Sequence, residues 1–140
     1  MLHHSTLVRW DANIQDPILS NQAAHLHVGY CHVQILIHRP FIPASPKKPS
    51  SLSFPSLAMC TNAARSASHL LEVQRQKRAP VMPSNVVVAF TSGIILLISM
   101  WGMKKTGGTV DTQSQTGDIH RCMKYLKFAE ERWHTAGRLL

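Results

Sequence analysis

Apolar residues recur at the helical period along most of this chain. Leu26, Tyr30, Val33 and Ile37 fall at i, i+4, i+7 and i+11, the spacing by which one face of an α-helix meets a core. Asp16-Pro17 precedes this stretch, and Pro40 disfavours helical geometry in the residue before it. The pattern therefore predicts a helix over about 18–38, with this stripe buried.

Two further stripes have the same spacing. The first predicts a helix after the N-cap Ser53, on positions separated by 3, 4, 3 and 4 residues: Leu57, Cys60, Ala64, Ala67 and Leu71. The second predicts a helix over about 119–137 with Asp118 as its N-cap, on Ile119, Cys122, Leu126, Ala129, Trp133, Ala136 and Leu140. Because both cysteines lie on stripes, we expect Cys60 and Cys122 to be buried.

The remaining helix, expected over 85–102 with Ser84 as its cap, is apolar on every side. Residues 86–103 form a run of 18 without a charge, followed by Lys104-Lys105. Such a run fits the central helix of a bundle, in which Ile94, Leu97 and Ile98 pack against the other stripes. It also reaches the lower limit for a membrane span flanked by cytoplasmic lysines. We expect the core role, and the membrane span stays open as the alternative.

The segments between the stripes predict connectors. Residues 1–17 are a polar N-terminal tail, residues 39–54 a Pro/Ser linker, and residues 103–117, rich in Gly, Thr and Gln, a flexible loop. The whole is predicted to be an all-α helical bundle of about four helices, occupying 18–140 as one domain.

Composition narrows the function. The net charge of +8 permits an acidic partner, but the Lys and Arg residues are scattered, which argues against direct binding of nucleic acid. Three cysteines without CxxC spacing imply no disulfide framework. The N-terminus has no apolar run long enough for a signal peptide, which favours an intracellular protein.

Residues that support catalysis or metal binding are present but badly spaced. His25, His27, Cys31 and His32 share one predicted helix, yet their side chains point around it, whereas zinc needs ligands that converge. The acids form no telling pair, and no GxSxG, HExxH or phosphate-binding loop occurs. We therefore expect no enzyme, no metal site and no cofactor in this chain.

Three motifs together carry a resemblance to a known family. The ending Ile35-Leu36-Ile37-His38-Arg39-Pro40-Phe41 is similar to an "LHRPF" helix, Cys60-Thr61-Asn62-Ala63-Ala64 to a "C..AA" helix, and Trp133 to Arg138 to a "W..A.R" helix. In this order they resemble the middle regulatory region of fungal zinc-cluster transcription factors, over roughly residues 20–140. The family-motif positions are Tyr30, His38, Arg39, Pro40, Phe41, Cys60, Ala63, Ala64, Trp133 and Ala136.

The resemblance implies that this chain is part of a larger α-helical regulatory domain located in the nucleus. Such a domain is expected to regulate transcription through interactions with proteins or an effector. A homodimer is one of the assemblies expected for it. The family's DNA-binding module needs six closely spaced cysteines around zinc, and this chain has three, scattered ones. Zinc and DNA contacts are therefore expected only in a missing N-terminal cluster, and the chain is expected to be a fragment. The alternatives are a small membrane protein with one span at 86–103 and a basic helical protein that binds nucleic acid.

Overall fold

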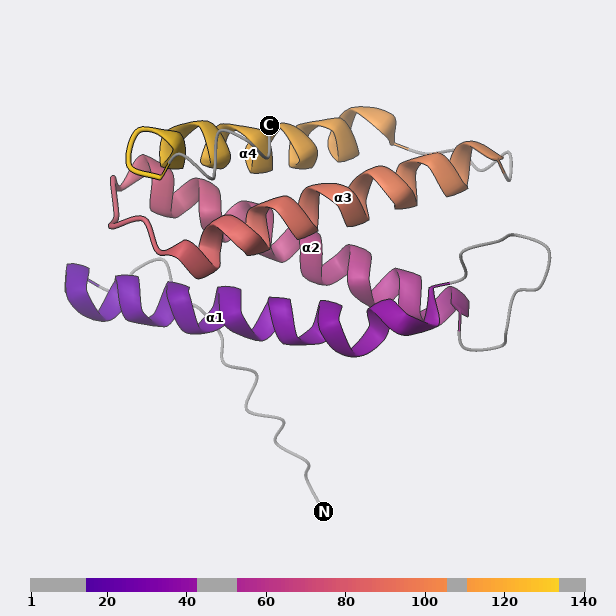
Figure 1. Cartoon of the computed structure of the whole chain (residues 1–140), viewed down its shortest axis with the longest axis horizontal. Helices are drawn as coiled ribbons and strands as arrows, with labels where there is room; N and C mark the ends of the chain where they lie inside the picture. Colours follow the sequence, from indigo (N-terminus) through magenta and orange to yellow (C-terminus); the bar gives the residue numbers. More distant parts are fainter. Residues whose placement is uncertain (1–14, 43–52, 106–110, 134–140) are drawn as a thin grey trace, which may run out of the picture.

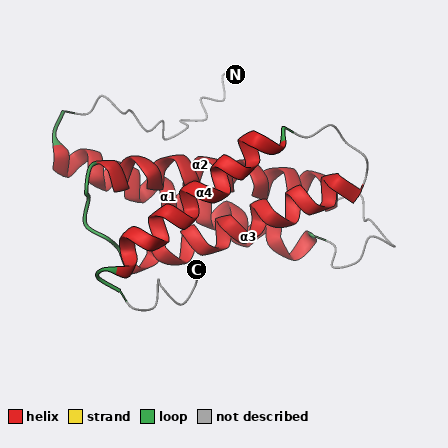
Figure 2. Ribbon diagram, turned by 90° about the horizontal axis from the view of Figure 1, so that it is seen from above, coloured by secondary structure: helices red, strands yellow, loops and turns green. Residues whose placement is uncertain are grey.

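The computed structural model describes residues 15–42, 53–105 and 111–133. They form α1 (Pro17–His38), the 3₁₀ turn η1 (Arg39–Phe41), α2 (Ser53–Gln76), α3 (Pro83–Lys105) and α4 (Thr112–Glu130). Figure 2 shows helices and loops alone in this part of the chain. The predicted all-α bundle of four helices is confirmed.

The ends of α1 follow from local sequence. The Asp16 carboxylate accepts a hydrogen bond from the Ile18 amide at 2.9 Å, and Pro17 occupies the first turn, where its missing N–H costs nothing. At the other end Pro40 does not release the chain at once. The backbone tightens into η1, in which the Ile42 amide donates to the Arg39 carbonyl at 3.1 Å. The helix predicted over 18–38 is thus confirmed.

Helix α2 contacts each of the other three helices. In Figure 1, α1 and α4 lie on opposite sides of the molecule with α2 and α3 between them. The predicted α2 stripe is buried apart from Leu57, which is half-buried. The small residues Ala63 and Ser68 are buried as well and widen this face, most of which consists of short side chains. Because such side chains are short, neighbouring helices can approach α2 closely from more than one side.

The C-terminus of α2 is closed by a Schellman motif. The Ala79 amide donates to the Gln74 carbonyl at 2.9 Å, and the Arg78 amide donates to the Arg75 carbonyl at 3.1 Å. Arg78 has φ of 50°, the left-handed geometry that this motif needs and usually gives to glycine. The basic end of α2 is therefore part of a helix cap that turns the chain toward α3.

The boundaries predicted for the last helix and the loop before it are wrong. Helix α3 continues to Lys105, and α4 already begins at Thr112, capped by Asp111, whose carboxylate accepts from the Ser114 amide at 3.2 Å. Helix α4 also ends at Glu130, before the predicted end at 137. The polar residues 112–117 suggest a loop by composition, but capping by Asp111 starts a helix over them.

The buried face of α3 is also different from the predicted one. Ile94, Leu97 and Ile98 do not pack inward but lie at the surface. The α3 side chains that face the other helices include three polar ones. The buried set is Asn85, Val86, Val88, Ala89, Ser92, Ile95, Leu96 and Ser99. The helix predicted over 85–102 extends over Pro83–Lys105. Ser84, predicted to be its cap, therefore lies inside the first turn.

Asn85 explains why a polar face turns inward. Its amide nitrogen donates to the Gln74 side chain of α2 at 2.9 Å, and its amide oxygen lies 3.2 Å from His25 Nδ1 of α1. It also hydrogen-bonds Tyr125 of α4, whose pKa is raised by burial against the opposing effect of this bond. One buried amide therefore links all four helices, and its hydrogen bonds specify how the helices are rotated.

Candidate functional site

The outer face of α1 carries a row of exposed apolar side chains, which we name the α1 seam: Leu19, Leu26, Tyr30, Val33 and Ile37. Leu26 is 69% exposed and Ile37 58%. The prediction that Leu26, Tyr30, Val33 and Ile37 are buried is therefore wrong. The α1 side chains that face the core are Ser20, Ala24, Val28, Cys31 and Ile35.

Both faces of α1 have the helical period, so tertiary packing chose between them. The buried face includes Ser20, Ala24 and Cys31, whose small side chains let α1 approach α2 closely. Leucine, tyrosine and isoleucine on the seam would hold the two helices further apart. The result is an α1 helix with one apolar face in the core and another at the surface.

Two of the family-motif segments meet in the core. The Cys60 thiol points at the Ile35 carbonyl at 3.7 Å, which brings the "C..AA" helix against the "LHRPF" helix. Ala63 and Ala64 are buried beside Cys60. Burial also raises the pKa of the Cys60 thiol, as expected for a cysteine that packs in the core.

The other motif positions lie at or near the surface. Tyr30 is on the seam, where its hydroxyl accepts from the Gln34 side chain at 3.1 Å, and His38 is half-buried at the end of α1. Arg39, Pro40 and Phe41 are exposed in η1. Trp133 follows the end of α4 and is exposed, and Ala136 lies outside the described residues.

The seam ends in a hollow between the end of α1 and the start of α2. Its volume is about 230 Å³, and it is lined by Ile37, His38, Phe41, Pro55, Ser56 and Met59. Ile37 belongs to both the seam and the hollow. A partner that packs along the seam would therefore reach this hollow at the C-terminal end of α1.

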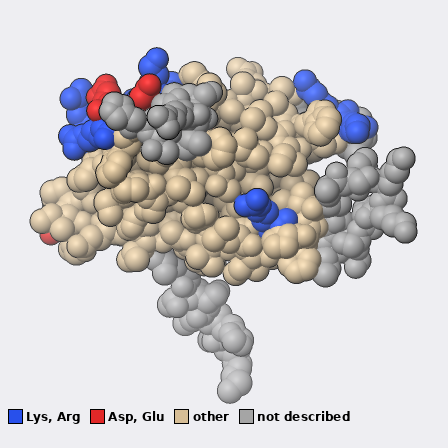
Figure 3. Space-filling view, viewed as in Figure 1, with Lys and Arg blue, Asp and Glu red and all other residues tan. Residues whose placement is uncertain are grey.

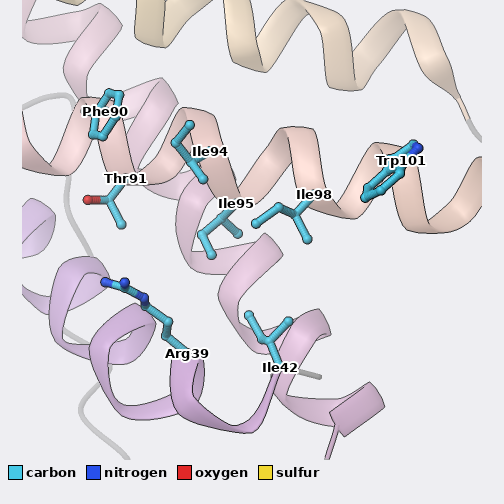
Figure 4. Close-up of a pocket in the computed structure, with 8 residues that line it drawn as sticks. All are labelled: Arg39, Ile42, Phe90, Thr91, Ile94, Ile95, Ile98 and Trp101. Carbon is cyan, nitrogen blue, oxygen red and sulfur yellow. The ribbon is translucent and has the colours of Figure 1, made fainter. Parts of the chain in front are cut away.

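A second and larger cleft lies between η1 and α3, with a volume of about 470 Å³. Figure 4 shows Thr91, Ile95 and Ile98 of α3 on one side, Arg39 and Ile42 on the other, and Trp101 at one end. Arg39 is its single charged lining residue, and Thr91 its other polar one. Sequence patterns gave no indication of this cleft, because it combines residues far apart in the chain.

Asp118 was predicted from sequence to be the N-cap of α4, and this prediction is wrong. It does not cap α4 but lies buried within it, at 2% exposure. Its carboxylate accepts from Arg121, lies 3.5 Å from Arg65 Nε and 3.4 Å from His69 Nε2, and receives the Ser68 hydroxyl at 3.5 Å. Because Arg65, Ser68 and His69 all belong to α2, this cluster ties α2 to α4. We assign it a structural role.

Histidines and cysteines do not gather elsewhere in the described chain. His25 bonds to Asn85, while Cys31 packs into the core, where burial raises its pKa to about 11. Within residues 15–42, 53–105 and 111–133, no group of three or more His, Cys, Asp or Glu is placed to hold a metal ion.

On the face seen in Figure 3, most charges lie toward the two ends of the molecule, and the broad area over α1 and α3 is uncharged apart from one basic patch between them. Among the described helices, α3 alone is long and apolar enough to cross a membrane. Its most apolar 18-residue segment has a mean hydropathy of 2.1, and 39% of that segment is buried in the bundle. Its exposed apolar side chains include Val87, Phe90, Ile94, Leu97, Ile98 and Trp101.

Comparisons with known proteins give no relative. No protein-family model, no curated protein and no solved structure matches the chain.

Proposed function

We propose that this chain is a helical interaction domain that takes part in transcriptional regulation, and that its α1 seam binds a helix of a partner protein. The observation that carries the proposal is the seam itself. A row of exposed leucine, tyrosine, valine and isoleucine follows one face of a well-formed helix. Contiguous apolar surface of this kind is typical of a binding site.

The spacing of the seam specifies the kind of partner. From Leu19 the seam positions follow at intervals of 7, 4, 3 and 4 residues, the a/d spacing by which one helix packs along another. They cover about 27 Å of α1 at 1.5 Å per residue. A partner helix with its own apolar stripe matches this length, and one large apolar side chain near its end can enter the hollow beside Phe41.

The regulatory role rests on the family resemblance. The three motifs occur in the order expected for the middle region of fungal zinc-cluster factors, and the first two contact each other through Cys60 and Ile35. On this proposal the domain acts in the nucleus and regulates through protein partners. Any DNA contact and any zinc belong to a separate module.

The test is to fuse the chain to an unrelated DNA-binding domain and measure transcription of a reporter in a fungal cell. We expect the fusion to change transcription relative to the DNA-binding domain alone. The double variant Leu26→Lys/Val33→Lys should abolish this change, since charges placed in the seam oppose the apolar contact. Both positions are exposed, so the fold should be retained, as thermal unfolding of the purified variant would verify.

The matched control is Asn62→Lys/Ser66→Lys, which adds the same charge to exposed polar positions of α2. It should leave the effect on the reporter unchanged. An inactive wild-type fusion, or equal losses in the two double variants, would refute the proposal. Size-exclusion chromatography with light scattering measures the oligomeric state of the wild type and the variant. A wild-type dimer that Leu26→Lys/Val33→Lys converts to monomer would identify a second copy of this chain as the partner.

One observation favours a second candidate, a single-span membrane protein with α3 as the span. The apolar segment of α3 is long, carries no charge and is less than half buried, and Lys104 and Lys105 follow it directly. In the bundle, however, α3 packs against α2 and α4 with a face that includes Asn85, Ser92 and Ser99. Wild-type chain recovered in carbonate-washed membranes would support the membrane candidate and overturn the interaction domain.

A further inference from the structure

The cleft between η1 and α3 has the composition of a site for a small apolar molecule. Its volume of about 470 Å³ falls within the range of roughly 300–1,000 Å³ that is usual for ligand sites. Ile95 is buried at its floor, whereas Phe90, Ile94, Ile98 and Trp101 are partly exposed along it. An apolar ligand would therefore cover side chains that water now contacts.

Charge specifies the ligand further. Arg39 alone among the lining residues is charged, and no ion pair joins it to an acidic residue within the described parts of the chain. The guanidinium is planar and presents paired donors that match the two oxygens of a carboxylate. The negative end of the α1 dipole lies nearby, but it amounts to about half a charge against the full charge of Arg39.

The direction of the cleft fits an elongated ligand. In Figure 4 the Arg39 side chain extends toward Thr91, and Ile95, Ile98 and Trp101 follow along α3. Thr91 and Trp101 are separated along the helix axis by about 15 Å, at 1.5 Å per residue. The Thr91 hydroxyl already donates to the Val87 carbonyl at 2.9 Å, which leaves Arg39, among the lining residues, as the group that attracts an anion. Lys105 lies outside the lining, with its ammonium 5.2 Å from the Trp101 ring.

We propose that this cleft binds an amphipathic carboxylic acid of medium chain length, with its carboxylate against Arg39 and its apolar body along Ile95, Ile98 and Trp101. Binding requires only the folded bundle and the cleft, which is separate from the α1 seam. The inference therefore goes beyond the proposed function and stands or fails independently of it.

Trp101 provides the measurement, because it lines the cleft and is 68% exposed. The chain has three tryptophans, so the variant Trp10→Phe/Trp133→Phe leaves Trp101 as the only tryptophan, whose emission is excited selectively over that of tyrosine. Its emission is recorded while decanoate is added below its micelle concentration. We expect a saturable shift to shorter wavelength, since the ligand removes water from the indole ring.

Three ligands of equal chain length separate the charge from the apolar body. Decanoate should bind most tightly, decanamide more weakly, and decyltrimethylammonium most weakly of the three. In the same background Arg39→Gln should weaken decanoate binding by about tenfold, the effect of losing one hydrogen-bonded ion pair, and should leave decanamide binding unchanged. Arg39→Lys should retain part of the preference for decanoate.

The matched control is Arg132→Gln, which removes an exposed arginine beyond the end of α4. It should not change decanoate binding, although the chain's net charge of +8 falls by the same amount. Ile98→Glu supplies a second variant within the cleft. Its carboxylate should repel decanoate and not decyltrimethylammonium, and Ile98 is exposed enough for the bundle to remain folded.

The proposal is overturned if Trp101 shows no saturable shift, or if Arg39→Gln and Arg132→Gln weaken decanoate binding equally. It also fails if decanamide binds as tightly as decanoate, because Arg39 would then make no contribution. An emission shift that depends on protein concentration and not on decanoate would show that a second copy of the chain fills the cleft.

Discussion

Two adjacent leucines of α3 offer the sharpest test of how this helix packs. Leu96 is 0% exposed and lies in the core, whereas Leu97 is 45% exposed. The same substitution at the two positions therefore changes burial but not sequence context, hydropathy or helix propensity. From sequence alone, Leu97 was expected to pack inward, so the structure moves the sensitive position by one residue.

The expected magnitudes follow from burial. Leu96→Ala removes a fully enclosed side chain and should lower the free energy of unfolding by about 2–5 kcal/mol. Leu97→Ala should lower it by about 1 kcal/mol, since nearly half of its side chain already contacts water. Leu96→Asp adds the cost of a buried unpaired carboxylate, several kcal/mol more. That total is comparable with the whole stability of a domain, about 5–15 kcal/mol.

Urea unfolding followed by circular dichroism measures all four variants against wild type. We expect Leu96→Asp to be unfolded without denaturant and Leu97→Asp to remain folded, within about 1–2 kcal/mol of wild type. In a membrane span the two aspartates would be equivalent, each opposing insertion by about 2.5–3.5 kcal/mol. Equal sensitivity at the two positions would therefore refute the packing described for α3.

Three further outcomes are expected. Asp118→Asn should lower the free energy of unfolding by about 1–3 kcal/mol, less than for a fully buried ion pair because its arginine partners are partly exposed. Burial raises the pKa of Cys31 from 9.0 to about 11 and that of Cys122 to about 12, so stability should fall as pH rises from 9 toward 12, where the unfolded chain loses these protons first. Gly29→Ala should stabilise α1 by roughly 0.5–1 kcal/mol, since its new methyl group meets open space.

Urea midpoints measure each of these. Asp118→Asn with wild-type stability would mean that the carboxylate is not buried among its partners. For the thiols, midpoints are compared at pH 8 and pH 10.5, and Cys122→Ala should show a smaller decrease. A midpoint that rises over this interval would contradict the assigned burial. A loss of stability in Gly29→Ala would show that something packs against α1 at that position.

Sequence predicted the architecture well where only one face of a helix is suited to burial. Helix α2 has a stripe of small and apolar residues opposite polar ones, and Cys60, Ala64 and Ala67 are buried as predicted. The start of α1 was also predictable, because Asp16 and Pro17 act locally. The start of α4 was missed, since the polar residues after Asp111 resemble a loop in composition.

For the candidate sites, sequence supplied the residues and not their roles. The seam positions were recognised as a stripe at the helical period but were assigned to the core. The cleft beside Arg39 was not predicted at all. It exists only because the end of α1 is placed against the middle of α3, which no local pattern encodes.

The sequence by itself determined the number of helices and the approximate extent of α1, because helical period, caps and prolines act within a few residues. Only the tertiary structure decided which faces of α1 and α3 are buried. Both helices are apolar on more than one side, so periodicity reveals a helix without selecting its rotation. Close approach of small residues selected it for α1, and hydrogen bonds to Asn85 selected it for α3.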